Sequence, residues 1–152
     1  MKRFYILTIL FALAVISTSA QVSKLFERYS DLKGVTSVYI SKTMIGMMPD
    51  ISTNGLEFKG MADKLNSIRV LTTENASIAD KMGKELDIEI KKDAYELLLS
   101  ANDNGEKAVI YLKPDANGVN NYLIVAQESS ELSIVLISGT LTPADIRKMN
   151  LK

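Results

Sequence analysis

The residue types on which most enzyme chemistry depends are missing from this chain. Its 152 residues contain no histidine, no cysteine and no tryptophan. This composition excludes Ser-His-Asp and Cys-His nucleophiles, histidine-bearing zinc sites, thiol redox centres and histidine-ligated haem. No phosphate-binding glycine loop and no Gly-x-Ser-x-Gly motif occurs either. The sequence therefore indicates no catalytic residue, no cofactor-binding residue and no metal ligand set, and argues against an enzyme.

Carboxylates are the remaining groups that could perform catalysis, and the chain has 18 of them. A pair about 5–10 Å apart in a concave pocket could hydrolyse a glycan or a peptide. Most acidic residues stand beside lysines, however, as in Glu85–Lys92, which is typical of a solvated surface. A carboxylate-based hydrolase is therefore kept as an alternative to a non-enzymatic protein.

Asp115-Ala116-Asn117-Gly118 resembles the beginning of a calcium-binding loop. In such a loop the bidentate glutamate would fall at Ala126, which cannot bind a cation. An Asn-Gly pair between two apolar runs is typical of a tight hairpin turn. We interpret the segment as a turn.

Met44, Met47 and Met48 share one face of an expected helix, and Met61 or Met82 could join them. Thioether sulfurs bind Cu(I) in oxidising compartments. Methionine is also a common filler of irregular cores, and no histidine accompanies the group. Packing in the core is the favoured interpretation.

Tyr39, Tyr95, Tyr111 and Tyr122 fall in expected strands. Together they could form a platform that stacks on a sugar or a peptide. The favoured interpretation is that they close a core while their hydroxyls remain in water.

The stretch Ala94–Thr140 is predicted to form a four-stranded antiparallel meander. Asn104-Gly105 and Asn117-Gly118 stand between apolar runs and predict hairpin turns with positive φ at both central residues. The expected strands are Ala94–Ala101, Lys107–Lys113, Val119–Gln127 and Leu132–Thr140.

The segment before the meander is predicted to contain two strands and several helices. The α+β fold class follows, with a mixed sheet, the C-terminal meander, and helices mainly on one face. The first two strands are separated by a helical crossover long enough for a right-handed β-α-β unit. The expected helices are Val22–Lys33, Lys42–Met48, Asn75–Ile88 and a short one from Thr142-Pro143 to Met149; the strands are Val35–Ser41 and Ser67–Thr72; Asp50–Gly55 is a polar loop, and Leu56–Asn66 fits a short helix poorly.

The last two strands of the meander, Asn121–Gln127 and Leu132–Thr140, carry apolar residues at both even and odd positions. A strand with one solvated face alternates between polar and apolar residues instead. Both faces of these strands must therefore be covered. The N-terminal helix and loops are the favoured cover, and a partner chain or ligand is the alternative.

Residues 1–20 are expected to be a signal peptide, followed by one domain over residues 21–152; an uncleaved N-terminal anchor is the alternative. Lys2-Arg3 precedes an apolar run that is too short to span a membrane, and small residues end at Ala20. Cleavage there leaves 16 basic against 18 acidic residues, a net charge of −2, which offers nothing to nucleic acid. The chain is expected to be periplasmic or extracellular, with no membrane span in the mature part.

Three segments carry a family resemblance: VTSVYISKTMIGMMP at Val35–Pro49, LNSIRVL at Leu65–Leu71 and ISGTLT at Ile137–Thr142. The chain resembles the exported domain-of-unknown-function family 4252 of Bacteroidetes from about Ser23 to Lys148. The resemblance implies a small cell-envelope protein of a Gram-negative anaerobe with no established activity and no catalytic residues to carry over. Some relatives are lipoproteins, whereas this chain lacks the cysteine that lipidation requires.

These observations favour an exported, non-enzymatic binding or interaction module. Its expected partner is an envelope protein or a second copy of the chain. The alternatives are the carboxylate hydrolase and a component of envelope-stress signalling.

Overall fold

The computed structural model describes residues 21–48, 52–53, 56–58, 60–115 and 117–148. The expected signal peptide and most of the expected loop Asp50–Gly55 lie outside these residues.

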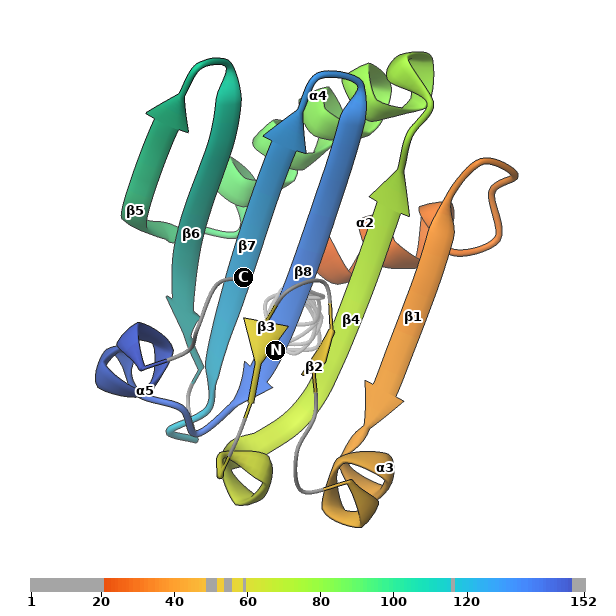
Figure 1. The fold of residues 1–152 in the computed structure, drawn as a ribbon. Helices are drawn as coiled ribbons and strands as arrows, with labels where there is room; N and C mark the ends of the chain where they lie inside the picture. Colours follow the sequence, from red (N-terminus) through yellow and green to blue (C-terminus); the bar gives the residue numbers. More distant parts are fainter. Residues whose placement is uncertain (1–20, 49–51, 54–55, 59, 116, 149–152) are drawn as a thin grey trace, which may run out of the picture.

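A single antiparallel sheet of six strands organises the fold (Figure 1). Its spatial order is β1-β4-β8-β7-β6-β5, so β4, β8, β7 and β6 lie inside while β1 and β5 form the edges. The strands are β1 (Thr36–Ser41), β4 (Leu65–Thr73), β5 (Glu96–Asp103), β6 (Glu106–Pro114), β7 (Asn120–Glu128) and β8 (Glu131–Gly139).

The predicted α+β class and the four-stranded meander are confirmed. Strands β5 to β8 pair in sequence order, each antiparallel to the next. At the first turn Asn104 and Gly105 have φ values of 49° and 89°, the positive φ that this hairpin requires. At the second turn Gly118 has a φ of 72°, but Asn117 is not among the described residues with positive φ, so the expectation for both central residues is wrong there. Local turn chemistry was therefore sufficient to identify the meander.

The expected mixed sheet is wrong, because β1 and β4 pair antiparallel and form no β-α-β unit. The connection between them contains α3 (Lys42–Met47), the hairpin of β2 (Ser52–Thr53) and β3 (Leu56–Glu57), and the 3-10 turn η2 (Ala62–Lys64). The connection spans residues 42–64 and is long enough for a crossover, so its length does not decide the pairing. Instead, α3 and η2 keep the chain at the lower end of Figure 1, where β4 begins beside the end of β1.

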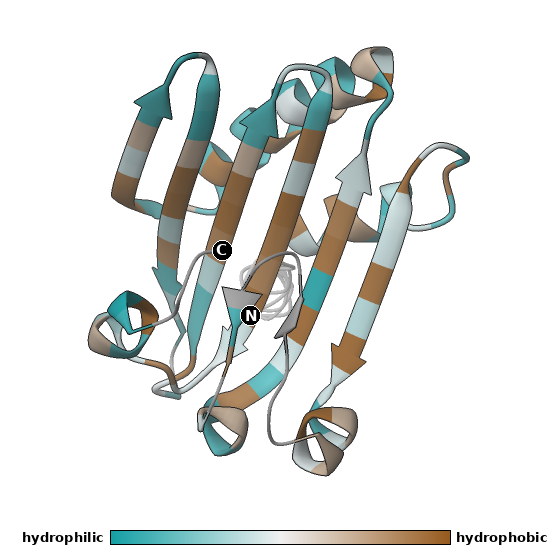
Figure 2. Cartoon of the chain, viewed as in Figure 1, coloured by the Kyte–Doolittle hydropathy of each residue, from teal (hydrophilic) through white to brown (hydrophobic). Residues whose placement is uncertain are grey.

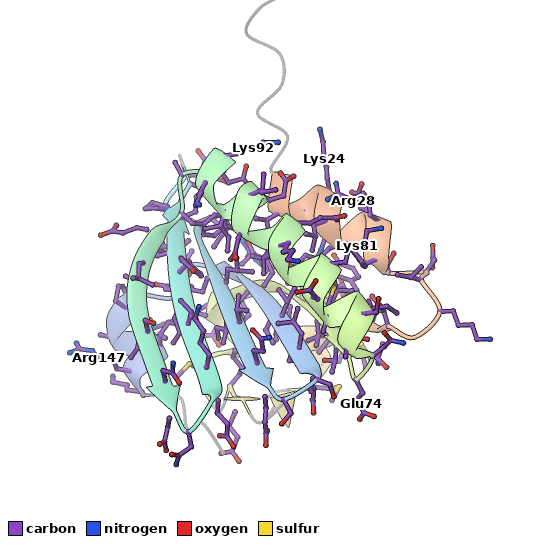
Figure 3. The ribbon with its side chains drawn as sticks, turned by 90° about the horizontal axis from the view of Figure 1, so that it is seen from above. Lys24, Arg28, Glu74, Lys81, Lys92 and Arg147 are labelled. Carbon is purple, nitrogen blue, oxygen red and sulfur yellow. The ribbon has the colours of Figure 1, made fainter. Side chains whose placement is uncertain are left out.

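One face of the sheet is covered by the two longer helices, α2 (Gln21–Tyr29) and α4 (Ala76–Lys92), and we call it the helix face (Figure 3). Asn75 caps α4, because its Oδ1 accepts the Ile78 N–H at 3.1 Å. α2 ends at Tyr29, earlier than the predicted Lys33. The core on this face contains Val22, Leu25, Phe26, Tyr29, Leu71, Ala79, Met82, Leu86, Ile90, Leu123, Leu132, Ile134 and Leu136.

The opposite face, which we call the hairpin face, is covered over its lower part by the β2–β3 hairpin, α3, η2 and α5 (Pro143–Arg147) (Figure 1). Its core contains Ile45, Phe58, Leu65, Ile68, Val70, Ile110, Leu112, Tyr122, Ile124, Val135, Ile137 and Leu141. Two cores on opposite faces explain why β7 and β8 carry apolar residues at both even and odd positions. The expectation that the chain itself covers both faces is confirmed for these two cores.

Gly139 closes the last strand at a point where two backbones nearly touch. A Cβ placed there would overlap the carbonyl oxygen of Lys64 and lie 3.1 Å from the Cα of Leu65. The same carbonyl accepts the Thr140 N–H at 2.8 Å, so the backbone cannot move away freely.

We expect Gly139→Ala to lower the free energy of unfolding by about 1–3 kcal/mol, because the backbone pairing at the end of β8 must shift. Thermal unfolding measures the loss. Gly46→Ala is the matched control, since no atom lies within 4 Å of its Cβ position. Equal effects from the two substitutions would contradict the close approach.

Asp145 links α5 to the rest of the hairpin face. Its carboxylate accepts the Thr142 N–H at 2.8 Å and pairs with Lys64 Nζ at 2.9 Å. Lys64 first and the Thr142 backbone second lower the pKa of Asp145 to about 2.

The lowered pKa predicts a pH-dependent contribution to stability. Above the unfolded pKa, about 3.9, the ionised carboxylate stabilises the fold, and this contribution is lost as the pH falls towards about 2. Asp145→Asn should therefore lower the unfolding temperature at pH 7 and have a much smaller effect near pH 2. A difference that is the same at both pH values would show that the charge of Asp145 is not responsible.

Candidate binding surface on the sheet

The strand register aligns one apolar row across all six strands on the hairpin face. Each member is the direct cross-strand partner of the next, from one edge of the sheet to the other. The four central members are buried, whereas the members on the edge strands are exposed. The row consists of Val38, Val70, Val135, Ile124, Ile110 and Leu99.

Two residues further up the strands, a second row on the same face contains only small side chains. It also runs through direct cross-strand partners over all six strands. Thr72 Oγ1 and Ser133 Oγ lie 3.2 Å apart within it, and no member is fully buried. The row consists of Thr36, Thr72, Ser133, Ala126, Ala108 and Ala101.

Carboxylates follow at the upper ends of the four meander strands, where the ribbon in Figure 2 turns hydrophilic. Asp103 pairs with Glu106, and Glu128 pairs with Glu131, across the two hairpins. In the part of the chain that the structure describes, none of these four side chains takes part in an ion pair. The upper end of the hairpin face is thus an acidic rim, with Lys107 as a basic neighbour of its carboxylates.

A hollow of about 280 Å³ lies between this rim and the small-residue row. Its wall includes the four rim carboxylates together with Ala101, Ala108, Ala126 and Ser133. No described helix or strand crosses it, because the β2–β3 hairpin and the short helices all lie lower on this face (Figure 1). We call the rim, the small-residue row and this hollow the open surface.

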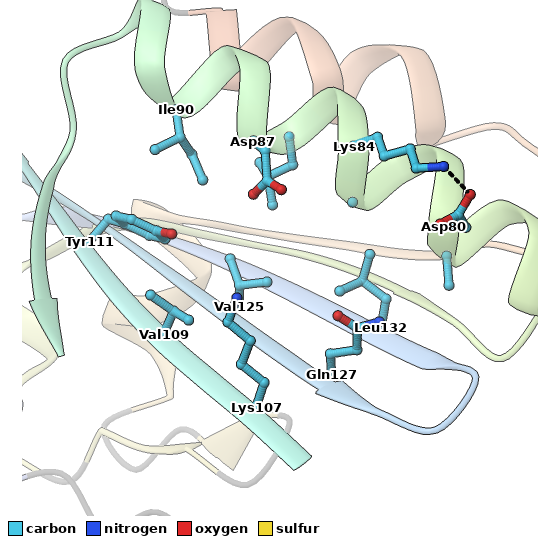
Figure 4. A pocket seen from close by; sticks show the side chains of 13 residues that line it. Asp80, Lys84, Asp87, Ile90, Lys107, Val109, Tyr111, Val125, Gln127 and Leu132 are labelled. Carbon is cyan, nitrogen blue, oxygen red and sulfur yellow. Dashed lines mark hydrogen bonds and ion pairs between the residues drawn. The ribbon is translucent and has the colours of Figure 1, made fainter. Parts of the chain in front are cut away.

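A second, smaller groove of about 170 Å³ lies between α4 and strands β6 to β8 on the helix face (Figure 4). Val109, Val125 and Leu132 form its apolar floor. Asp87 lies above Tyr111, and burial first and the Asp87 charge second raise the pKa of that phenol. Asp80 is paired with Lys84 at 2.8 Å. The groove is smaller than the roughly 300–1,000 Å³ that small-molecule sites occupy.

The four strand tyrosines do not form one platform. Tyr122 is fully buried on the hairpin face, where its hydroxyl donates to the Leu141 carbonyl at 2.9 Å, so the expectation of a solvated hydroxyl is wrong for it. Tyr111 packs against the core of the helix face. Tyr39 is exposed on edge strand β1 under the Arg69 guanidinium, and Tyr95 precedes the other edge strand, with Lys113 over its ring.

The three methionines of α3 are exposed, so the favoured interpretation of core packing is wrong for them. Met47 is 74% exposed, and Met44 and Met48 are also exposed, whereas Ile45 is the residue of α3 that enters the core. A helix of six residues on the sheet rim can bury only one narrow stripe. Met82 lies in the core of the helix face, on the opposite side of the sheet from α3, and so cannot join the group.

Sequence reasoning did not identify the open surface, because its rows depend on how distant strands align. The available signal was local. Asp103, Glu106, Glu128 and Glu131 each flank a hairpin turn and stand two residues from an alanine or a serine. The strand register places these carboxylates side by side in one row and the alanines and the serine side by side in the next.

Within the described ranges, no helix is long and apolar enough to cross a membrane. The same residues contain no group of three or more acidic side chains placed to hold a metal ion.

Exposure of the small-residue row predicts a contrast between two neighbours on β7. Ala126→Val should change the free energy of unfolding by no more than about 0.5 kcal/mol, because its side chain enters open space. Ile124→Ala should cost about 2–5 kcal/mol through loss of core packing. Denaturant unfolding measures both, and a large loss for Ala126→Val would mean that the row is covered.

Comparison with known proteins identifies one family. A family described as a domain of unknown function, DUF4252, matches residues 29–149. Among curated proteins and among solved structures, none matches the chain significantly. The matched stretch includes every strand of the sheet, the core of the hairpin face and the open surface, whereas Val22, Leu25 and Phe26 of the other core precede it. The chain therefore belongs to the DUF4252 family.

Proposed function

We propose that the protein is an exported, non-enzymatic binding module of the cell envelope, and that its open surface receives a basic amphipathic helix of a partner protein. The proposal rests on two neighbouring features of the hairpin face, the small-residue row and the acidic rim. Together they line a hollow on the surface of the sheet.

The small-residue row suits a helix because short side chains let a rod of about 10 Å diameter approach the sheet closely. Six strands about 4.8 Å apart make the row about 24 Å long. A helix of about 16 residues covers that distance at 1.5 Å per residue. Alanines and leucines of the helix would lie over Ala101, Ala108 and Ala126 and reach the exposed Leu99.

The acidic rim determines the chemistry of the partner. Adjacent residues on one face of a strand are about 7 Å apart, so the rim lies one side-chain length above the small-residue row. Lysines or arginines on one flank of the helix would meet the carboxylates of Asp103, Glu106, Glu128 and Glu131. Complementary charges of this kind give orientation and a fast association rate more than raw affinity.

Export is supported by the character of residues 1–20. A basic start, a short apolar run and small residues ending at Ala20 are typical of a signal peptide. An envelope location in a Bacteroidetes cell agrees with the family resemblance.

A defined peptide tests the binding surface. The probe is a helical peptide of about 16 residues with alanine and leucine on one face and lysines along one flank. NMR titration of the mature protein should shift the methyl signals of Ala101, Ala108 and Ala126. Glu106→Lys combined with Glu128→Lys should weaken binding about tenfold, and added salt should weaken it further.

A control variant makes the same change of charge at a site away from the open surface. Glu27→Lys combined with Asp31→Lys alters exposed carboxylates of the α2 region and should leave the affinity unchanged. The same peptide with glutamates in place of lysines should not bind. Shifts confined to strand β5 or to the α4 groove, or equal binding by the rim variant, would overturn the proposal.

A photo-crosslinking amino acid in living cells tests the biological partner. Placed at Ala126 it should capture a segment with basic, amphipathic helical character, which mass spectrometry of the crosslinked peptide identifies. Placed at Ile88, which is exposed on α4, it should not capture that segment. Capture of a second copy at Ala126 would instead indicate self-association through the open surface.

A further inference from the structure

We propose that Asp93 and Glu89, at the end of helix α4, form a binding site for the α-ammonium group that signal-peptide cleavage creates at Gln21. The site would make removal of the signal peptide a stabilising step of folding.

Helices α2 and α4 run antiparallel, and the first turn of α2 meets the last turn of α4. The Val22 N–H donates to Asp93 Oδ2 at 2.9 Å. Near the other end of α2, Arg28 Nη2 lies 3.4 Å from Glu85 Oε2. The first turn of α2 contains no acidic residue of its own. Asp93 therefore caps the beginning of α2 from a different helix, although 71 residues separate it from Val22.

Glu89 adds a second buried carboxylate to the same place. It lies one helical turn before Asp93, and each of the two residues is only 8% exposed. Glu89 Oε2 has no hydrogen-bond partner within the described chain. Burial of a carboxylate oxygen without a hydrogen-bond partner lowers the stability of the fold. A cation or a hydrogen-bond donor at this position would offset that loss.

The lysines near these carboxylates are at the limit of ion-pair distance. Lys92 Nζ lies 4.0 Å from Glu89 Oε1, and Lys113 Nζ lies 3.9 Å from Asp93 Oδ1. Lys113 also lies over the Tyr95 ring, and burial and the Asp93 charge raise the pKa of Tyr95. Among the described residues, Glu89 Oε2 is therefore the carboxylate oxygen that can still accept a closer donor.

Cleavage after Ala20 would place such a donor at the site. The backbone nitrogen of Gln21 is one residue from the Val22 nitrogen that already contacts Asp93. Before cleavage this nitrogen is a neutral amide, and afterwards it is an ammonium with three donors. A positive charge at a helix N-terminus is ordinarily unfavourable because of the helix dipole. Two carboxylates offset that effect through charge-assisted hydrogen bonds.

Two forms of the protein test the site. One chain begins at Gln21 with a free amine, released from a cleavable fusion, and the other begins at Ser19, which moves the ammonium two residues away. Mass spectrometry confirms that Gln21 has not cyclised. At pH 7 the chain that begins at Gln21 should unfold at a temperature about 3 °C higher.

Substitutions identify the groups responsible. Asp93→Asn combined with Glu89→Gln keeps the side-chain shapes and should abolish the difference between the two chains. Glu85→Gln, elsewhere on α4, should preserve it. The ammonium pKa should be raised above its ordinary value of about 8, so the difference should be present at pH 7 and disappear once the pH exceeds the raised value.

Equal unfolding temperatures for the two chains, or a difference that survives both carboxylate substitutions, would overturn the proposal. An exported protein whose mature N-terminus is not Gln21 would also overturn it. These outcomes are independent of peptide binding, which takes place on the opposite face of the sheet.

Discussion

The register of strand β8 between β4 and β7 is the constraint on which the rest of the structure depends. Its nine residues contribute to one core through Leu132, Ile134 and Leu136 and to the other through Val135 and Ile137. A slip by one residue would exchange these two sets. Because both sets are apolar, the hydrophobic pattern alone resists such a slip weakly. The close approach of Gly139 to Lys64 and the hairpin at β7–β8 supply the missing specification.

The same register makes the two faces unequal along their length. Helices α2 and α4 lie over the helix face, whereas the elements on the hairpin face gather at its lower end. Upward from the core, the residues on that face become small and then acidic. A solvated sheet surface normally carries long polar side chains. Six short ones in a row are unusual, and this is the physical reason to consider the face a docking surface.

The contact between α2 and α4 joins the beginning of the described chain to its middle. Asp93 ends α4 and also accepts the Val22 N–H, so two helix termini of opposite dipole sign meet in one buried place. This arrangement makes the first turn of α2 part of the fold. A change of charge at the Gln21 nitrogen, as proposed for signal-peptide cleavage, would therefore act on a structured region.

What the sequence by itself determined is the local structure. Asn104-Gly105 specified a hairpin because few other residues adopt positive φ, and Ser41 and Asn75 specified helix starts because their side chains accept backbone N–H groups. Apolar residues on both faces of β7 and β8 likewise indicated that both faces of these strands must be covered. These features depend on residues within a few positions of one another.

Only the tertiary structure decided how separate segments align. Antiparallel pairing of β1 with β4, exposure of the α3 methionines and the acidic rim all depend on which strands become neighbours. Residues as distant as Thr36 and Ala101 enter one row through five successive pairings. The two-residue period of a strand predicts only on which face of the sheet a side chain lies. It does not predict the cross-strand neighbours of that side chain, because the packing of the whole sheet selects them.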